Sequence, residues 1–255
     1  MLKVERQKKI LELLERTDSV LVTDLSQIFK CSDETIRRDL KEMEKSKLLT
    51  RTHGGAFKST RNDKTYPSKI RNVLLLNEKI KISKKAMDLI QENDFIFLDS
   101  STTCFQLAKF IIKAKINLTI ATNSILITNL CTQEKNNIDL IMIGGYLRNN
   151  NMSTIGVEGI NQISNYFADK CILSPPKVSL DKGLFGNNIL EANIRKSMIA
   201  HASSTIVLAD HTKFKSITNY KISTMDKIDK LISDKNFSEE EIDLIKKYKI
   251  DSIRA

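Results

Sequence analysis

The sequence contains few of the residues that mark fibrous or disulfide-stabilised proteins. Its 255 residues include 8 glycines and 3 prolines, too few for a collagen-like or mucin-like chain. The four cysteines form no Cys-x-x-Cys pair and have no histidine at ligand spacing; they are Cys31, Cys104, Cys131 and Cys171. This spacing predicts reduced, structural thiols and excludes a disulfide framework and a zinc site. We expect neither a metal nor a cofactor.

Long apolar runs are also missing. No run approaches the roughly 18 residues that a membrane span needs, and the charged start of the chain lacks the apolar core of a signal peptide. We therefore expect no membrane partner and a cytoplasmic location. Hydrophobic residues make up 41% and charged residues 28% of the chain, a balance typical of soluble globular proteins. At roughly 100 to 200 residues per domain, the length predicts two domains.

The net charge of +10 is unevenly distributed along the chain. Residues 1–85 carry 21 Lys and Arg against 12 Asp and Glu, whereas residues 86–255 carry 20 against 19. This asymmetry predicts a segment that binds a polyanion, joined to a nearly neutral domain. A merely solvated basic surface is the alternative interpretation.

Three amphipathic helices and a short hairpin are predicted at the start of the chain. Apolar residues recur at helical spacing over residues 4–14, 23–29 and 33–45. Thr23 and Ser32 are the expected N-caps of the second and third helices. A strand-like stretch at 48–51, followed by the glycines of residues 53–57, predicts a hairpin that would form a wing.

The third predicted helix has one apolar face and one mostly basic face. Its apolar stripe consists of Ile36, Leu40 and Met43, and its opposite face of Glu34, Arg37, Arg38, Lys41 and Lys45. A helix, a short turn and a basic second helix form a helix-turn-helix, whose second helix enters the major groove. For an isolated helix, a solvated charged face is the alternative.

Beyond residue 77, strand-like runs alternate with helical patterns. Strands are predicted at 95–98, 118–121, 138–143, 170–173 and 205–209, and helices at 77–90, 103–113, 124–131, 190–202 and 238–248. Strands separated by helices of this length predict βαβ units and a mostly parallel sheet. The expected fold class is α/β, with a winged helix-turn-helix domain (1–57), a linker (58–76) and a larger α/β domain (77–255).

A phosphate site is predicted between the strand at 95–98 and the helix that follows it. Asp99 ends the strand, and residues 100–103 lead into the helix, where hydroxyls and backbone N–H groups meet the positive end of the helix dipole. On local sequence alone, an ordinary N-cap is the alternative. Two more predicted strands end in polar or glycine residues, so three strand ends would line one crevice.

Two motifs at the N-terminal end resemble the DeoR family of bacterial transcriptional repressors: Thr35-Ile36-Arg37-Arg38-Asp39-Leu40 and Arg51-Thr52-His53-Gly54-Gly55-Ala56. The likeness continues at residues 99–103, 122–124, 144–148 and 210–214. It implies a winged helix-turn-helix followed by an effector-sensing domain similar to sugar-phosphate isomerases. One recognition helix per chain reads few bases, so we expect a homodimer or homotetramer on double-stranded operator DNA.

The basic face and the resemblance together give the predicted site residues. The DNA-binding residues are Ser32, Thr35, Arg37, Arg38, Lys41, Arg51 and His53. The effector-binding residues are Asp99, Ser101, Thr102, Thr103, Thr122, Asn123, Gly144, Gly145, Arg148 and Lys213. For two of these residues the alternative is a role without ligand binding: His53 can be a structural residue of the turn, and Lys213 can be a surface lysine.

The sequence departs from the family pattern at four places. Lys47 stands where a glycine usually closes the recognition helix, although a cation there suits the helix dipole. Ser100 replaces a glycine and adds bulk inside the phosphate loop. Ser174-Pro175-Pro176 replaces a small, glycine-containing turn, and Asn187-Asn188 falls near the usual threonine. The last three departures touch the expected effector pocket.

The sequence therefore predicts a repressor of a sugar-utilisation operon that leaves its operator when a phosphorylated sugar binds. One alternative is an isomerase-like enzyme, with Asp99, Asp169, Asp181 and Asp210 as candidate bases. A recognition helix argues against that class, and no base-plus-orienter pattern is visible, so we expect no catalytic residue. The other alternative, a DNA-binding protein without an effector, is disfavoured by the polar strand ends.

Overall fold

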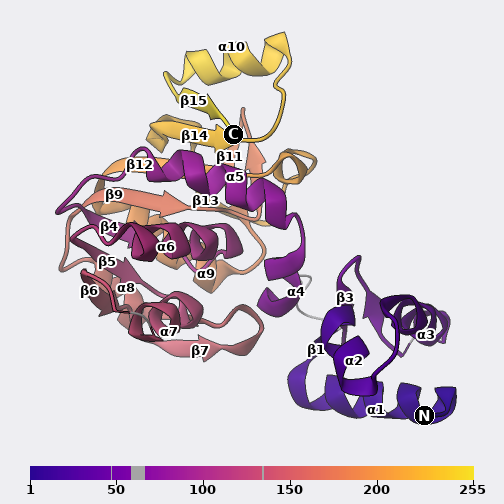
Figure 1. Ribbon diagram of the computed structural model, residues 1–255. Coiled ribbons are helices and arrows are strands. Elements are labelled where there is room, and N and C mark those ends of the chain that lie inside the picture. Colours follow the sequence, from indigo (N-terminus) through magenta and orange to yellow (C-terminus); the bar gives the residue numbers. More distant parts are fainter. Residues whose placement is uncertain (47, 59–66, 134) are drawn as a thin grey trace. The chain divides into compact units, whose positions relative to one another are not determined.

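The computed structural model describes residues 1–46, 48–58, 67–133 and 135–255. The chain forms two compact units, Met1–Leu76 and Asn77–Ala255 (Figure 1). The first unit has one apolar core and the second has two. Among the described helices, none combines the length and the apolar character that a membrane crossing requires.

The first unit is a winged helix-turn-helix, as predicted. Its elements are α1 (Lys3–Thr17), β1 (Ser19–Leu21), α2 (Val22–Phe29), α3 (Asp33–Lys45), β2 (Thr50–Arg51), β3 (Gly55–Phe57) and α4 (Ser68–Val73). The three strands form an antiparallel sheet in the order β1-β3-β2. Ile10 of α1, Leu25 of α2 and Ile36 of α3 are buried together in the core.

The helix-turn-helix begins and ends close to the predicted residues. Ser32 is the N-cap of α3, where its Oγ accepts a hydrogen bond from the Thr35 N–H at 3.3 Å. The prediction that Thr23 caps α2 was wrong, because Leu21 occupies that position. The chain enters α2 directly from β1, a strand that the sequence did not predict because its partner β3 lies more than thirty residues away.

Helix α4 belongs to the first unit, although its residues fall within the predicted linker. It lies against β1, with Ile70 fully buried and Lys69 Nζ 2.6 Å from Asp24 Oδ2. The close packing here also requires a glycine at residue 55 of β3, since a Cβ there would lie 2.0 Å from the Val20 carbonyl oxygen of β1 and 2.9 Å from Ile70 Cδ1 of α4. Residues 59–66 of the predicted linker, and the departure noted at Lys47, lie outside the described residues.

The second unit is built on a seven-stranded parallel sheet in the order β15-β14-β12-β9-β4-β5-β6. Its strands are β4 (Phe95–Leu98), β5 (Leu118–Thr122), β6 (Ile138–Met142), β9 (Ala168–Leu173), β12 (Ala202–Ala209), β14 (Lys230–Ser233) and β15 (Asp251–Arg254). The predicted parallel sheet is confirmed. Because β5 and β6 extend from one side of β4 and β9 joins the other, the strand order reverses between β4 and β9.

Helices cover both faces of this sheet. They are α5 (Leu76–Met87), α6 (Thr102–Ala114), α7 (Ile125–Gln133), α8 (Val157–Ile163), α9 (Ile189–Ala200) and α10 (Glu239–Lys247). Ile96 and Leu98 of β4 are buried against α5, α6 and α7, whereas Phe97 is buried with side chains of α8, α9 and α10. Successive side chains of a strand point to opposite faces, so one short apolar strand serves both cores.

Short antiparallel strands were missed by the sequence analysis. They are β7 (Tyr146–Arg148) with β8 (Ser153–Ile155), and β10 (Lys177–Ser179), β11 (Gly183–Gly186) and β13 (Tyr220–Ser223). Three 3-10 turns, η1 (Asn149–Asn151), η2 (His211–Phe214) and η3 (Met225–Lys227), lie among them. β7 and β8 follow the carboxyl end of β6, and η2 follows that of β12, so both bring side chains to the same edge of the sheet.

Candidate functional site

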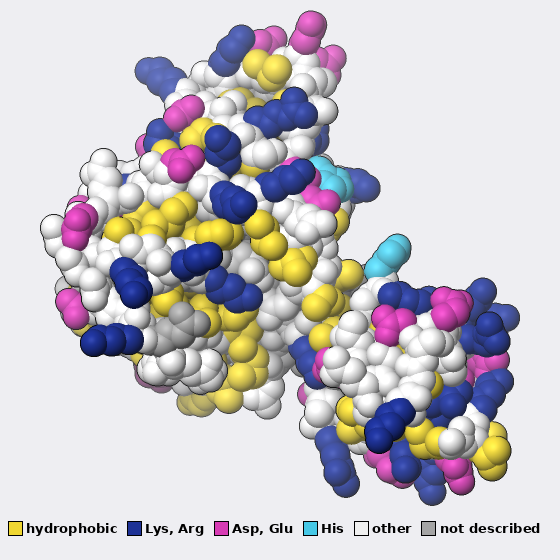
Figure 2. All heavy atoms as spheres, in the orientation of Figure 1, with side chains coloured by type: hydrophobic (Ala, Val, Ile, Leu, Met, Phe, Trp, Pro, Cys, Tyr) yellow, Lys and Arg dark blue, Asp and Glu magenta, His cyan; other side chains and the backbone are white. Residues whose placement is uncertain are grey.

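The exposed face of α3 carries the cations predicted to contact DNA. Arg37, Arg38 and Lys41 are exposed, while Ile36 and Leu40 on the opposite face are buried. Figure 2 shows Lys and Arg side chains over the surface of this unit. Arg38 and Lys41 form no hydrogen bond or ion pair with any described residue, so both can reach phosphates or base edges.

The other predicted DNA-binding residues take part in contacts within the unit. Arg37 Nη1 donates a hydrogen bond of 2.7 Å to the carbonyl oxygen of exposed His53, which ties α3 to the turn of the wing. Arg51 Nη1 lies 3.8 Å from Glu44 Oε2, and the Arg51 N–H donates to the same carboxylate at 2.9 Å. The hydroxyls of Ser32 and Thr35 lie 2.9 Å apart at the helix cap. DNA contact by these residues remains a prediction.

Asp39, in the middle of the first family motif, has a structural role that sequence reasoning missed. Its Oδ2 accepts a hydrogen bond from Arg6 Nε at 2.5 Å, and the two side chains are 3% and 11% exposed. This bond raises the pKa of the Arg6 guanidinium. The available signal was the position of Asp39, three residues after Ile36 on the buried side of α3.

Replacing Arg6 by methionine should lower the free energy of unfolding of the first unit by about 2–3 kcal/mol, because Asp39 would stay buried without its partner. Urea unfolding followed by circular dichroism measures the loss. Lys8→Met, at an exposed position of the same helix, should change stability by less than about 0.5 kcal/mol. Equal stability of the two variants would show that the pair contributes little.

The second candidate site lies at the carboxyl ends of the parallel strands. Asp99 follows β4, Asn123 follows β5, Ser174 follows β9 and Asp210 follows β12, and all four side chains are buried. β4 and β9 are the neighbours between which the strand order reverses. Open α/β sheets bind their ligands at this point, since the connections there diverge to opposite faces.

The loop of residues 100–103 joins β4 to α6 in a fixed conformation. Ser101 is the N-cap of α6: its Oγ accepts from the Cys104 N–H at 3.1 Å, and its own N–H donates to Asp99 Oδ1 at 3.0 Å. The Thr103 carbonyl accepts a 3.1 Å hydrogen bond from Ser83 Oγ of α5. Ser100 does not have a positive φ, so the backbone here does not require a glycine.

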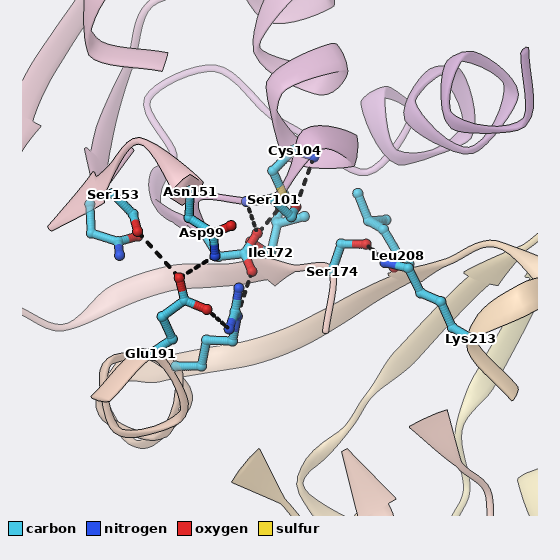
Figure 3. Close-up of polar contacts among 12 residues, drawn as sticks. Asp99, Ser101, Cys104, Asn151, Ser153, Ile172, Ser174, Glu191, Leu208 and Lys213 are labelled. Carbon is cyan, nitrogen blue, oxygen red and sulfur yellow. Dashed lines mark hydrogen bonds and ion pairs between the residues drawn. The ribbon is translucent and has the colours of Figure 1, made fainter. Parts of the chain in front are cut away.

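A buried ion-pair network joins Asp99 to α9 (Figure 3). Arg195 Nε donates to Asp99 Oδ2 at 2.7 Å, and Arg195 Nη1 lies 3.7 Å from Glu191 Oε2. Glu191 Oε1 in turn accepts hydrogen bonds from Arg148, Asn151 and Ser153 of the β7–β8 hairpin. The negative charges of two carboxylates are therefore balanced by the positive charges of two guanidinium groups, with little exposure to water.

The network keeps both carboxylates ionised. Burial opposes ionisation, but the charge of Arg195 and the hydrogen bonds to Asp99 hold its pKa below the usual value. Burial likewise opposes the charge of Glu191, whose pKa is lowered by Arg195, Arg148 and Asn151. Asp99, predicted to bind sugar hydroxyls, therefore accepts from protein donors with both oxygens. A carboxylate held in this way is a poor proton acceptor at neutral pH.

Glu191 and Arg195 were not predicted as site residues. Local sequence gave no signal for them, because α9 reverses the usual pattern: it buries these two charged residues and leaves the apolar Ile189 and Leu190 exposed at 42% and 44%. Asn188, one of the noted departures, caps the helix by accepting from the Leu190 and Glu191 N–H groups at 3.0 and 3.1 Å. Its position explains why an amide is suitable there.

The ends of β5 and β6 are shaped mainly by contacts within the protein. Thr122 Oγ1 accepts from the Ser124 N–H at 3.1 Å. Gly144 donates its N–H to Gln162 Oε1 at 2.8 Å. Gly145 has a φ of +127° and lies so close to the Ile155 carbonyl that a Cβ would be 2.4 Å from its oxygen. The β7–β8 hairpin therefore already accounts for this glycine.

Among the buried polar atoms of the described residues that lack a hydrogen-bond partner, two belong to this part of the site. One is Asn123 Oδ1, whose Nδ2 donates to the Thr154 carbonyl at 2.8 Å. The other is Arg195 Nη1. Asp99 and Asn123 follow the paired residues Leu98 and Thr122, so the two atoms belong to one region of the sheet edge. An acceptor and a donor left in this way suit a hydroxyl group or an ordered water.

Lysines gather around Asp210 on the other side of the loop. Burial opposes the ionisation of Asp210, while Lys213, hydrogen bonds from Thr212 and the charge of Lys79 lower its pKa. Lys213 Nζ donates to Ser174 Oγ, and Ser174 Oγ donates to the Leu208 carbonyl at 2.5 Å (Figure 3). The departure at Ser174 thus supplies a partner for Lys213.

The charge of Lys213 reaches the start of α6, and a role of this lysine in anion binding remains a prediction. Its charge acts on Cys104 in the first turn of α6, although burial is the main cause of the raised pKa of that thiol. Lys177 Nζ lies 3.5 Å from the Thr212 carbonyl oxygen in η2. Lys79 was missed, although it stands on the buried stripe of α5 with Ile82 and is only 5% exposed.

The four aspartates considered as enzymatic bases do not form one site. Asp169 lies near the start of β9, where its Oδ2 accepts from the Phe95 N–H at 2.8 Å, at the opposite end of the strand from Ser174. Asp181 is exposed in the turn between β10 and β11. Asp99 and Asp210 remain at the sheet edge, each held by cations.

Comparison with known families finds two matches that together cover most of the chain. Residues 6–61 match the DeoR-like helix-turn-helix domain, and residues 75–235 match the DeoR C terminal sensor domain.

Two individual proteins show the same likeness over most of their length. The HTH-type transcriptional regulator GolR of Listeria innocua is 34% identical over 234 residues, covering 92% of this chain and 91% of that protein. The HTH-type transcriptional repressor GlcR of Bacillus subtilis is 30% identical over 237 residues, covering 92% and 90%. Among solved structures, ribose 5-phosphate isomerase A of Methanocaldococcus jannaschii matches with a TM-score of 0.39 and 18% identity, over 53% of each chain.

Proposed function

The chain belongs to the DeoR family of transcriptional regulators, and we propose that it represses a sugar-utilisation operon and leaves its operator when a phosphorylated sugar binds to the second unit. The distribution of charge along the carboxyl edge of the sheet supports the part of the proposal that concerns the effector. One side of the loop of residues 100–103 is rich in lysine, and the other side is charge-balanced.

The lysine-rich side is suited to a phosphate group. Among the described residues, Lys79, Lys177 and Lys213 approach the region where Asp210 is the buried carboxylate. The N-terminus of α6 adds its positive dipole and the N–H groups of its first turn, the usual features of an anion site. We propose that Ser101, Thr102 and Thr103 bind the phosphate and that Lys213 offsets its charge.

The balanced side is suited to the sugar. The two carboxylates of Asp99 and Glu191 are matched by Arg148 and Arg195, so a second anionic group would gain little there. Asn123 Oδ1 and Arg195 Nη1 can accept from and donate to a hydroxyl once the ligand displaces water or shifts a side chain. We therefore propose a sugar monophosphate rather than a bisphosphate as the effector.

A melting screen tests the effector. A ligand at 100 times its dissociation constant stabilises the folded state by about 2.7 kcal/mol, so pentose and hexose monophosphates should raise the melting temperature and free sugars should not. Bisphosphates should act more weakly. Lys213→Met should reduce the shift, while Lys215→Met, at an exposed position of the same segment, should keep it. A panel of monophosphates that shifts neither melting nor operator affinity would contradict the proposal.

The DNA-binding half rests on α3. Its exposed Arg38 and Lys41, on a unit whose wing is tied to the same helix by Arg37, support operator binding by a homodimer or homotetramer on paired half-sites. By linkage, the effector should weaken operator affinity by the same factor by which the operator weakens effector binding.

We further propose that the protein is not an enzyme. The support is that Asp99 is held ionised by Arg195 and that the other aspartates considered as bases are dispersed. Incubation of the purified protein with pentose and hexose monophosphates should give no product. Steady conversion that a single aspartate substitution abolishes would favour the isomerase-like alternative.

A further inference from the structure

We propose that Lys79 couples effector binding to operator release. Its ammonium group responds to the charge of the bound phosphate, and it lies in the helix that begins at the boundary of the two units. This inference rests on the proposed function and adds to it the route by which the second unit acts on the first. It assigns to Lys79 a role that differs from that of Lys213.

The position of α5 in the chain is the first observation. The helix begins at Leu76, the last residue of the first unit, and Lys79 lies in its first turn. Only Leu74 and Leu75 separate it from α4, which lies against β1 in the first unit. Leu75 has a φ of +50°, a left-handed conformation that is costly for a leucine. The connection is therefore short and conformationally restricted.

The inner face of α5 is the second observation. Lys79, Ile82, Ser83 and Ala86 form its buried side, with Lys79 only 5% exposed. Ser83 donates to the Thr103 carbonyl in the loop that we assign to the phosphate. Lys79 stands one helical turn earlier on this side, and its charge acts on Asp210. Ile82 and Ala86 on the same side share a buried core with Leu208 of β12, so Lys79 lies on the face of α5 that meets both the loop and the end of β12.

The charge change on binding is the third step. Without a ligand, the positive charges of Lys79 and Lys213 both act on Asp210. A phosphate group adds between one and two negative charges at neutral pH, so the balance of forces on each ammonium group changes. Lys213 lies in η2, far along the chain from the first unit, whereas a displacement of Lys79 is transmitted to the first turn of α5, which begins at the last residue of that unit. A buried lysine has little room to move independently of its helix.

The test separates binding from coupling. We would compare Lys79→Met, Lys213→Met and, as a matched control on the exposed side of α5, Lys81→Met. The dissociation constant of each protein is measured by calorimetry for the monophosphate that gives the wild type its largest melting shift. Operator affinity is then measured by fluorescence anisotropy at about 100 times that constant, where the sensor is saturated. Inorganic phosphate serves as a second probe.

At saturation, wild type and Lys81→Met should lose operator affinity by a factor of about 5 to 150. Lys213→Met should need more ligand but show the full loss once saturated. Lys79→Met should bind operator normally without ligand, retain a melting shift at saturation, and lose operator affinity by less than about twofold. A full loss in saturated Lys79→Met would overturn the inference while leaving the proposed function intact, whereas a wild type that responds to no probe would overturn both.

A second measurement does not depend on the variant. Hydrogen exchange of the wild-type amides at residues 74–82 should slow or quicken on addition of the monophosphate and stay unchanged with the free sugar. If Lys79→Met no longer binds the ligand, this result decides the question. Unchanged exchange at these residues in a wild type saturated with monophosphate would overturn the inference.

Discussion

Arg195→Met is expected to lower the free energy of unfolding by about 3–5 kcal/mol, the largest stability effect that we predict for a single substitution. The side chains of Asp99 and Glu191 are 1% and 3% exposed, and Arg195 is the cation that contacts both. Methionine fills much of the same space but leaves the two carboxylates without that charge. Lys196→Met, at the neighbouring exposed position of α9, is the matched control and should change stability little.

The loss of unfolding free energy in Arg195→Met should depend on pH, and the direction of this dependence identifies its cause. In the wild type the pKa values of Asp99 and Glu191 are lowered on folding, so their contribution is complete above the unfolded pKa of about 4 and is lost as pH falls through the folded values. In the variant, burial without Arg195 should raise both values above those of the wild type. The difference between the two proteins should therefore be largest near neutral pH and shrink on acidification.

Urea unfolding of both proteins between about pH 7 and pH 4 measures this difference. A destabilisation that stays constant over the range would mean that lost packing, rather than lost charge, accounts for it. Partial recovery of the variant at low pH would support the network as an electrostatic element of the fold.

Arg38→Ala is expected to weaken operator binding by about 1–3 kcal/mol. This loss of affinity should occur only with operators that keep the base pair read by Arg38. Lys41→Ala should instead weaken binding to all operator sequences alike and reduce the slope of affinity against salt by about one, as for a phosphate contact. The distinction follows from chemistry, since a planar guanidinium can bind a base edge with two hydrogen bonds while an ammonium group acts as a point charge.

Retardation assays with single-base operator variants, repeated at several salt concentrations, measure both effects. Lys8→Ala on α1 is the control and should bind like the wild type. If Arg37→Ala and Arg38→Ala both left affinity and specificity unchanged, α3 would not be the recognition helix. Arg37→Ala has an additional expected effect, because it removes the 2.7 Å bond to the His53 carbonyl that ties the wing to α3.

The central strands and longer helices could be predicted because one physical cause, the burial of apolar side chains, determines their sequence pattern. β4, for example, reads as Phe95-Ile96-Phe97-Leu98, an unbroken apolar run, since both of its faces are buried. β1 is only three residues long, and its sequence does not reveal that it will pair with β3 beyond two intervening helices. Short strands such as β7 and β10 were missed for the same reason.

The site could be predicted as far as the geometry of a parallel sheet determines it. The residues at strand ends, Asp99 and Asn123 among them, lie together because the carboxyl ends of neighbouring parallel strands share one edge. Their partners could not be predicted from local sequence. Arg195 lies 96 residues from Asp99 and is brought to it by the packing of α9, and Lys79 approaches Asp210 through the packing of α5.

The pairing of β4 with β9 has a consequence for the order of events during synthesis. Ile96 of β4 pairs opposite Lys170 of β9, so the two halves of the sheet edge cannot meet until the ribosome has passed β9. The first unit uses only residues up to 76, and domains fold from the N-terminus as they emerge, with distant strand pairings forming slowly. A new chain should therefore complete its winged helix-turn-helix unit before its second unit, so the folding of the two units is separated in time.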